Sequence, residues 1–385
     1  MKTLFDLSVS SASGIEAVTK RELSSLGISY DRCENGRIYF RGDENNIAEC
    51  NLLLRTASRV YITVASFRAE DFDALYAGVF SADWQDYLPA DAKIIVSGKC
   101  VSSRLMAVSA CQSVTKKAIC DKLALKYGAP PDETGARYKT EISVYKNTVT
   151  LSLDTSGESL HKRGYRGLVG EAPLKETVAA ALVDLSGWKT DTPFVDLFCG
   201  SGTFPVEAAM KAAGIPAGIN RNFDFTEWKN FDFSVFGEVK EKAVAAINKK
   251  ADFYICGYDI DEKQIKLAEK HAALAGVADM IHLQRRDMRD FSTKKKGGVF
   301  ISNPPYGERL SDRNSVKKLY RDFGKICESY PDWACFILTS VSDFERHFGK
   351  AADKKRKIYN GKLECFYYSY YPVTDEKKKK ITKID

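Results

Sequence analysis

The sequence predicts an α/β protein whose C-terminal half is a mostly parallel sheet with an antiparallel last strand. Two observations support this fold class. After residue 173, apolar strands alternate with amphipathic helices, an order typical of parallel sheets covered on both faces. Near the end, the segment RKIYNGKLECFYYSYY places Asn360-Gly361 between two β-rich stretches, which is a strong hairpin signal. We therefore expect a doubly wound sheet that ends in an antiparallel hairpin.

The first half of the chain predicts small α+β units. Two repeats of strands and helices are visible, and a long helix over 105–128 closes at Gly128. No catalytic group of residues stands out there, so this half is expected to bind or position a partner. The predicted domains are residues 1–64, 65–157 and 173–385, joined before the last domain by a charged, glycine-rich linker over 158–172.

Composition narrows the class of protein. The formal net charge is +7, and residues after 160 carry 39 Lys and Arg against 31 Asp and Glu, which fits a polyanionic partner. The ten cysteines form no CxxC pair or metal-ligand cluster, so reduced thiols in a cytoplasmic protein without a metal are expected. No signal peptide or membrane-spanning apolar stretch is visible.

An aromatic-rich insert over 215–250 interrupts the alternation of strands and helices. We expect a surface lid with its own small core, or a segment that partly faces the substrate. Its aromatic residues are Phe223, Phe225, Trp228, Phe231 and Phe233.

A glycine-rich turn in VDLFCGSGTFPVEAA, residues 195–209, joins a strand to a helix. Gly200 and Gly202 allow the backbone to approach a ligand. A dinucleotide fingerprint needs a third glycine, but Pro205 stands there. Asp196, just before the turn, instead suits a cation such as a sulfonium or an amino-acid ammonium. A plain tight turn is the alternative.

Two further acids follow the next two strands. Asp259 could accept hydrogen bonds from both hydroxyls of a ribose, as in other nucleotide-binding folds. Asp287 could reach an adenine amino group, with Met288 packed on the ring. Each acid alone is more typical of a helix N-cap or of a surface residue. Their recurrence at successive strand ends beside the glycine turn favours a nucleoside-binding edge.

A fourth strand ends in Asn303-Pro304-Pro305-Tyr306. If the ligand is a methyl sulfonium, an exocyclic amine could attack it once its lone pair is turned toward the methyl. The Asn303 side-chain oxygen and the Pro304 carbonyl could hold the N–H groups and stabilise the positive charge that develops. Tyr306 could stack on an unstacked base. The alternative is a turn that only ends the strand.

Together these motifs resemble the class I, S-adenosylmethionine-dependent RNA methyltransferases that carry a THUMP domain, and in particular the RlmL-like family. The matching stretches are HKRGYR (161–166), APLKETVAAAL (172–182), DLFCGSGT (196–203), GYDID (257–261), NPPYGERL (303–310) and KKRKIYNGKLE (354–364). The resemblance implies a Rossmann-like methyltransferase domain preceded by ferredoxin-like and THUMP domains.

The resemblance also implies a function: methyl transfer to guanine N2 in large-subunit (23S) ribosomal RNA. Asn303, Pro304 and Tyr306 would be catalytic, and Pro305 would contact the RNA. Separately, Lys162, Arg163 and Arg166 are candidate phosphate contacts or a solvated charge cluster. The cofactor-binding residues would be Asp196, Phe198, Cys199, Gly200, Gly202, Thr203, Asp259, Ile260, Asp287, Met288 and Asn303.

Three other functions remain open. A DNA adenine-N6 methyltransferase would use the same Asn-Pro-Pro-Tyr chemistry, and a tRNA guanine-N2 methyltransferase would share the cofactor and the amine. A non-catalytic RNA-binding assembly factor would keep the fold without turnover. We expect RNA as the partner, assume a monomer, and regard the basic end DEKKKKITKID as a nonspecific RNA-attracting tail.

Overall fold

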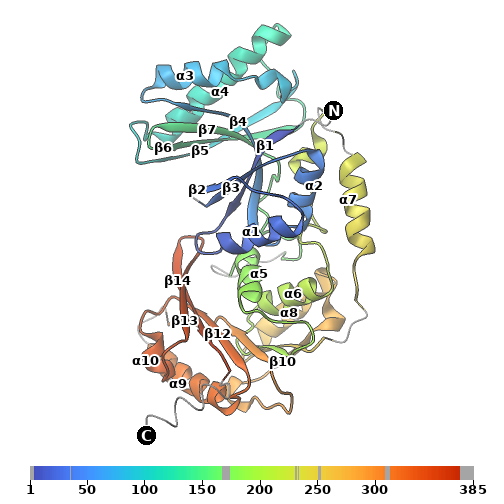
Figure 1. The fold of residues 1–385 in the computed structure, drawn as a ribbon, viewed down its shortest axis with the longest axis vertical. Helices are drawn as coiled ribbons and strands as arrows, with labels where there is room; N and C mark the ends of the chain where they lie inside the picture. Colours follow the sequence, from blue (N-terminus) through green and yellow to red (C-terminus); the bar gives the residue numbers. More distant parts are fainter. Residues whose placement is uncertain are drawn as a thin grey trace. The chain divides into compact units, whose positions relative to one another are not determined.

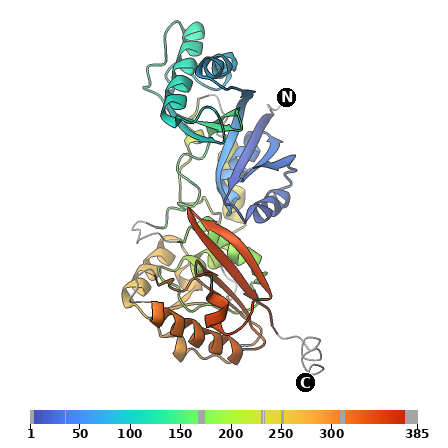
Figure 2. The same cartoon turned by 90° about the vertical axis from the view of Figure 1, so that its left-hand side faces the viewer.

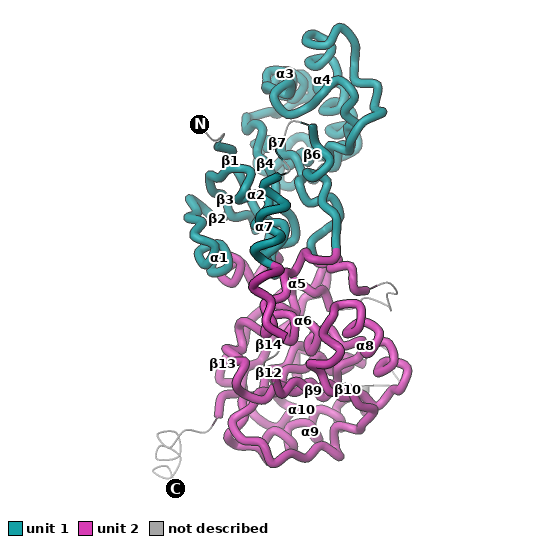
Figure 3. The backbone as a smooth tube through the Cα atoms, turned by 90° about the vertical axis from the view of Figure 1, so that its right-hand side faces the viewer, with its two compact units in different colours: residues 1–11, 20–160, 221–243 teal, residues 12–19, 161–220, 244–385 magenta. Residues whose placement is uncertain are grey.

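The computed structural model describes residues 4–34, 36–166, 174–229, 232, 234–249, 253–307 and 313–372 (Figure 1). They form two compact units. Unit 1 comprises the described residues of 1–11, 20–160 and 221–243, and unit 2 comprises those of 12–19, 161–220 and 244–385 (Figure 3). Each unit contains a seven-stranded sheet.

Unit 1 is built on a single sheet with the strand order β2-β3-β1-β4-β7-β6-β5. The two repeats predicted from the sequence are therefore merged, because β4 pairs with β1 on one side and with β7 on the other. The strands are β1 (Phe5–Ser11), β2 (Arg32–Glu34), β3 (Arg37–Gly42), β4 (Ala57–Arg68), β5 (Lys93–Val101), β6 (Arg137–Tyr145) and β7 (Thr148–Asp154).

Three helix ends of this half coincide with local sequence signals. Asp43 and Asp71 are N-caps whose side chains accept hydrogen bonds from Asn46 N and Ala74 N, respectively. Gly128, at φ +81°, ends the predicted long helix. The helices are α1 (Glu16–Ser25), α2 (Glu44–Leu53), α3 (Phe72–Ser81), α4 (Val108–Tyr127) and the short η1 (Trp84–Asp86).

The sequence led us to expect a surface lid with its own core, but the aromatic insert does not form one. Phe223, Phe225 and Trp228 belong to the hydrophobic core of unit 1. Trp228 is completely buried, and its ring stacks on Tyr138 of β6 at 4.9 Å between centroids. The stacking joins residues 90 positions apart. Phe231 and Phe233 lie outside the described residues. The insert contains η2 (Asp224–Glu227) and α7 (Ser234–Ala245).

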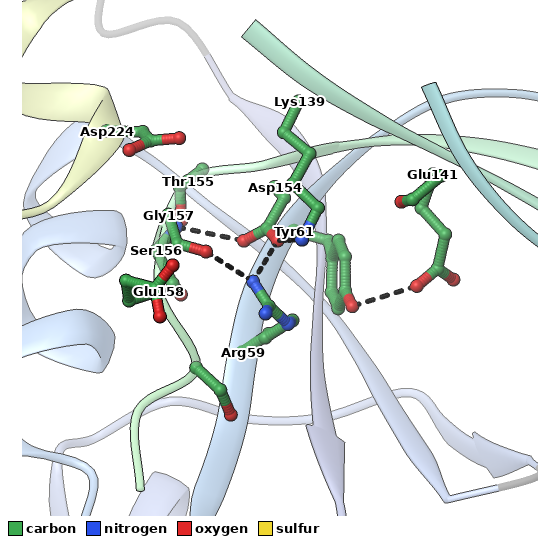
Figure 4. A network of polar contacts seen from close by, with 12 residues as sticks. Arg59, Tyr61, Lys139, Glu141, Asp154, Thr155, Ser156, Gly157, Glu158 and Asp224 are labelled. Carbon is green, nitrogen blue, oxygen red and sulfur yellow. Dashed lines mark hydrogen bonds and ion pairs between the residues drawn. The ribbon is translucent and has the colours of Figure 1, made fainter. Parts of the chain in front are cut away.

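Five charged or polar residues on β4, β6 and β7 form what we call the junction network: Arg59, Tyr61, Lys139, Glu141 and Asp154 (Figure 4). Asp154 pairs with Arg59 and, at 3.3 Å, with Lys139. The hydroxyl of Tyr61 donates to Glu141 at 3.0 Å. The network thus ties together three neighbouring strands of the unit 1 sheet.

Unit 2 contains the predicted doubly wound sheet, with the order β10-β9-β8-β11-β12-β14-β13. Adjacent strands from β10 to β12 are parallel, and β14 is antiparallel to both β12 and β13. The two long strands β13 and β14 are the red strands in Figure 2. The strands are β8 (Phe194–Asp196), β9 (Ile255–Asp259), β10 (His282–Arg285), β11 (Val299–Ser302), β12 (Ala334–Thr339), β13 (Lys354–Asn360) and β14 (Leu363–Tyr370). The Asn-Gly hairpin is confirmed.

Alternate residues of these strands enter two different cores, one on each face of the sheet. Phe194 packs with α5 and α6, whereas its neighbour Val195 packs in the core shared with α9 and α10. This two-sided burial explains why the strands read as continuous apolar runs. The helices are α5 (Glu176–Leu185), α6 (Thr203–Ala212), α8 (Glu262–Leu274), α9 (Arg313–Ser329) and α10 (Phe344–Phe348), with the short η3 (Ala278–Met280) and η4 (Met288–Asp290).

The first helix of the predicted domain over 173–385, α5, begins at Glu176, and Pro173 itself lies outside the described residues, as does the basic tail. Among the residues that the structure describes, no helix combines the length and apolar character needed to cross a bilayer.

Candidate active site

The four motifs singled out in the sequence lie along one edge of the unit 2 sheet. Strands β10, β9, β8 and β11 are parallel neighbours, so their carboxyl ends share that edge. Asp287, Asp259, Asp196 and Asn303 come at or just after these ends, in the same order as the strands. The strand order reverses between β8 and β11, where ligands bind in open α/β sheets. The fold therefore brings the predicted residues together.

The glycine turn between β8 and α6 is held against its neighbours by its backbone. Gly200 and Gly202 have φ of +51° and +83°, which favour glycine. The Gly200 amide donates to Asp259 Oδ2 at 2.9 Å. A Cβ at Gly202 would lie 2.9 Å from the Cβ of Ala268 on α8, so this glycine also allows close helix packing. At Gly200, by contrast, the nearest atom to such a Cβ is 4.0 Å away.

Asp196 ends β8 as a buried carboxylate, with 1% of its surface exposed. One oxygen accepts a hydrogen bond from the Phe198 amide at 3.0 Å. Ser302 of β11 is a further hydrogen-bond partner, and its hydroxyl also accepts from the Leu197 amide at 3.1 Å. Burial raises the pKa of Asp196 to about 7, because a charge in a low-dielectric site is costly.

Asp259 ends β9 and is also held by backbone amides, those of Gly200 and Asp261, each at 2.9 Å. Burial raises the pKa of this carboxyl, and its amide partners oppose the rise. Within the described residues, neither Asp196 nor Asp259 forms an ion pair with a cationic side chain. The edge therefore carries one buried carboxylate, Asp196, and one half-buried carboxylate, Asp259, that could accept a cationic or hydroxyl-bearing ligand.

Other residues predicted to hold the cofactor surround these acids in different ways. Phe198 is half-buried against Phe323 of α9, at 5.2 Å between ring centroids. Cys199 is buried, which raises the pKa of its thiol. Met288 is buried in the same core as α9, whereas Ile260 is 61% exposed. Ile260 alone among these four presents most of its surface to solvent.

Asp287 is engaged by a residue that the sequence did not single out. Arg289 donates to both oxygens of its carboxylate, and this pairing lowers the pKa of Asp287. Asp287 also caps η4 by accepting from the Arg289 amide at 2.9 Å. The predicted contact with an adenine amino group stays a prediction, since Arg289 would have to share or release the carboxylate.

The Asn303–Tyr306 segment leaves β11 with its two prolines in different environments. Pro304 is buried and Pro305 is exposed. The Pro305 carbonyl accepts a hydrogen bond from the buried Tyr320 hydroxyl at 2.8 Å. The Tyr306 hydroxyl donates to Asn303 Oδ1. One of the two acceptors that the sequence predicts for a substrate amine is therefore already in use by a neighbouring side chain.

A pocket of about 660 Å³ opens beside this segment, between it and helix α9. Residues 303–307 form one wall, and Lys318 and Asp322 of α9 contribute charged groups to the lining, as does Arg289. The volume falls within the range of about 300–1,000 Å³ typical of small-molecule sites, so a nucleobase would fit.

The predicted phosphate contacts do not all face solvent. Lys162 is exposed, in keeping with such a contact. Arg163 is 2% exposed and pairs with Glu207 of α6 at 3.3 Å, so the prediction does not fit this residue. Arg166 is also largely enclosed and pairs with Glu176 at 3.1 Å. Basic residues in a glycine-rich linker looked solvated in the sequence, but here two of the three anchor helices.

Sequence reasoning missed three residues at this site. Ser302 sits at the end of β11, where a polar residue closing an apolar strand was a usable signal. Tyr320 and Arg289 gave no such signal. Tyr320 meets Pro305 only through tertiary packing, and Arg289 meets Asp287 only through a tight turn.

Comparison with known proteins defines the class. The RMKL-like methyltransferase domain matches residues 163–369, the RlmL ferredoxin-like domain 6–61 and the THUMP domain 69–154. The chain is thus a methyltransferase with ferredoxin-like and THUMP domains before its catalytic fold. It belongs to the RMKL-like methyltransferase family.

Two relatives place the chain more closely. It is 41% identical over 370 residues to YpsC of Bacillus subtilis (strain 168), which carries the provisional name of an RNA methyltransferase; the match covers 95% of this chain and 96% of YpsC. It is 33% identical to the ribosomal RNA large subunit methyltransferase K/L of Buchnera aphidicola subsp. Acyrthosiphon pisum (strain APS). That match covers 98% of this chain but 57% of the relative's length.

Two solved structures share the whole fold. SMU.472, named as a methyltransferase candidate, was solved with SAH; it is 43% identical, covers 97% of this chain and 99% of its own, and has a TM-score of 0.92. A Listeria monocytogenes str. 4b F2365 protein, which carries the predicted function of an N6-adenine-specific DNA methylase, is 43% identical over 96% of this chain and 97% of its own, with a TM-score of 0.91.

The family and the SAH-bound relative together identify S-adenosylmethionine as the methyl donor. The donor set of the sheet edge fits such a ligand. Its ammonium and sulfonium are cationic. Asp196 is a buried carboxylate and Asp259 a half-buried one, and neither is paired with a cationic side chain among the described residues. When bound, the cofactor supplies an activated methyl group on sulfur.

Proposed function

We propose that this protein transfers a methyl group from S-adenosylmethionine to the exocyclic N2 amine of a guanine in large-subunit ribosomal RNA. The observation that carries the proposal is that an open pocket at residues 303–307 lies on the same sheet edge as Asp196 and Asp259, which form no ion pair within the described residues. The THUMP match and the name of the K/L relative support RNA as the substrate. Lys162 and the basic tail remain proposed RNA contacts.

In this proposal, the cofactor lies over the glycine turn, with Asp196 and Asp259 holding its charged and hydroxyl groups. Phe198, Cys199, Thr203, Ile260, Asp287 and Met288 complete its surroundings. Within the described residues the Pro304 carbonyl accepts no hydrogen bond, so it is available for a substrate N–H.

Asn303 Oδ1 and the Pro304 carbonyl would each accept a hydrogen bond from one N–H group of the amine, and so turn its lone pair toward the methyl. They would also stabilise the positive charge that develops on nitrogen as the methyl leaves sulfur, and one N–H proton would then pass to water to give the neutral methylated amine. Tyr306 would stack on the base once its hydroxyl leaves Asn303. The bond from Tyr320 to the Pro305 carbonyl keeps this backbone fixed, so little reorganisation is needed.

The test is methylation of 23S ribosomal RNA from a strain that lacks this protein, with radiolabelled S-adenosylmethionine. Labelled N2-methylguanosine is the expected nucleoside, identified by mass spectrometry. Asn303→Ala should lower kcat by about 10²- to 10³-fold, the usual loss when one acceptor or donor of a reacting centre is removed. If Asn303→Ala methylates at the wild-type rate, the mechanism is wrong and a binding-only role gains support.

A second candidate is methylation of adenine N6 in DNA, which the Listeria relative's predicted function favours. The same two acceptors would serve that amine. Equal amounts of unmodified DNA, tRNA and 23S RNA in one reaction separate the candidates, because N6-methyladenine in DNA, or N2-methylguanosine confined to tRNA, would replace the ribosomal assignment.

A further inference from the structure

Arg166 connects the glycine turn to the start of helix α5 through the two terminal nitrogens of its guanidinium. Nη2 donates to Ser201 Oγ at 2.9 Å and to Thr203 Oγ1 at 2.7 Å. Nη1 donates to the Leu174 carbonyl at 2.9 Å and to Glu176 Oε1 at 3.1 Å. The Arg166 side chain is only 9% exposed and that of Glu176 only 4%. The charge is therefore committed to internal contacts rather than offered to solvent.

Helix α8 holds the same turn from another side. His271 Nδ1 lies 2.9 Å from the Ser201 carbonyl and, facing a carbonyl, must donate its hydrogen. Ala268, one turn earlier on α8, packs against Gly202. Ser201 is thus fixed through its side chain by Arg166 and through its carbonyl by His271. Gly200, directly before it, has open space where a side chain would stand.

We propose that Arg166 is a positioning residue for cofactor binding: it fixes Ser201 and Thr203 so that the Gly200 backbone is preset for the ligand. The proposal rests on the placement of S-adenosylmethionine over this turn. Two left-handed glycines leave the turn many backbone conformations in the absence of such anchors. Presetting one of them lowers the ordering cost that the ligand must otherwise meet.

The geometry calls for arginine rather than lysine. Four acceptors on two elements are reached at once by a planar group with five N–H donors, whereas an ammonium has three donors at a single point. Arg163, three residues earlier, does not share this role, because it pairs with Glu207 on the body of α6.

The experiment measures SAH affinity of the full chain by titration calorimetry, so that no RNA substrate is needed. Arg166→Ala should weaken binding by about tenfold or more, and Arg166→Lys should recover only part of that loss. Millimolar guanidinium should restore the affinity of Arg166→Ala, while equimolar urea should not. Lys211→Ala is the matched control, since it breaks the 2.7 Å ion pair with Asp184 between α5 and α6 without touching the turn; its affinity should equal wild type.

If Arg166→Ala folds poorly, Ser201→Ala and Thr203→Val remove its acceptors one at a time, and each should weaken binding several-fold. Wild-type affinity in both, or in Arg166→Ala, overturns the proposal. So does a loss that guanidinium leaves unchanged, or an equal loss in Lys211→Ala, because either would indicate a general effect on α5–α6 packing. A wild-type chain that binds no SAH would contradict the cofactor assignment itself.

Discussion

The two units each bury an aspartate at the end of a strand, but only one of these aspartates is paired with cationic side chains within the described residues. Asp154 of β7 and Asp196 of β8 are both 1% exposed. Asp154 is paired with Arg59 and Lys139 in the junction network (Figure 4). Asp196, by contrast, contacts a backbone amide and a hydroxyl. Burial raises the pKa of both carboxyls, and only that of Asp154 is counteracted by cations.

This difference separates a structural role from a binding role. A buried charge with its partners in place holds strands together and has little left to offer a ligand. A buried carboxylate without a cation remains costly until one arrives, so cation binding relieves that cost. The comparison predicts opposite outcomes when each carboxylate is removed.

Asp154→Ala should cause the largest loss of stability, about 3 kcal/mol in the free energy of unfolding, because it leaves two cations without their buried partner. Chemical denaturation of the full chain, followed by the fluorescence of the buried tryptophans, measures this. Asp6→Ala is the control, because Asp6 pairs with Arg41 at the surface, where their side chains are 66% and 73% exposed, respectively. The loss in the free energy of unfolding should therefore stay below about 0.5 kcal/mol. Equal losses would mean that the junction network is not special.

Asp196→Asn should have the opposite effect on stability, because it should make the folded protein more stable while it weakens ligand binding. At pH 8 it should raise the free energy of unfolding by about 2 kcal/mol, since a charge no longer has to be buried. It should also weaken SAH binding by about 10- to 100-fold, the usual weight of a charge-assisted contact. Denaturation and calorimetry on the same samples check both signs. A variant that is both less stable and still tight-binding would contradict the contrast.

The pH dependence of stability and of cofactor affinity follows from the pKa of Asp196, which burial raises to about 7. Between pH 4 and 7 the folded protein binds a proton at Asp196 that the unfolded chain has lost, so wild-type stability should fall as pH rises through this window. Affinity for cationic S-adenosylmethionine should instead rise, by about tenfold between pH 6 and 8, as the carboxylate ionises. Calorimetry across this range, with Asp196→Asn as the pH-independent reference, would refine the pKa.

The smallest effect should come from Tyr320→Phe, which removes the hydroxyl that fixes the Pro305 carbonyl. The binding carboxylates are untouched, so SAH affinity should be unchanged. The methyl-transfer rate on the RNA that the methylation assay shows to be the substrate should fall by about fivefold, as for one lost hydrogen bond. Tyr370→Phe, which removes a 3.3 Å bond to the Lys350 carbonyl away from the pocket, should react normally.

Much of the site followed from chain order alone. In a parallel sheet, residues that close successive strands must meet at one edge, so the positions of Asp196, Asp259, Asp287 and Asn303 in the sequence were enough to place them together. The Asn360-Gly361 hairpin was equally local, because its turn chemistry lies within adjacent residues.

Only the tertiary structure decided to which unit residues 221–243 of the aromatic insert belong, and what Arg163 and Arg166 do. Trp228 is 90 positions from the Tyr138 ring on which it stacks, and Arg166 is 35 from Ser201. Periodicity and turn propensity report what lies next along the chain, and they carry no information about such distant partners. The sequence by itself determined the order of the strand ends; the packing of remote segments determined which charges are paired and which are left for a ligand.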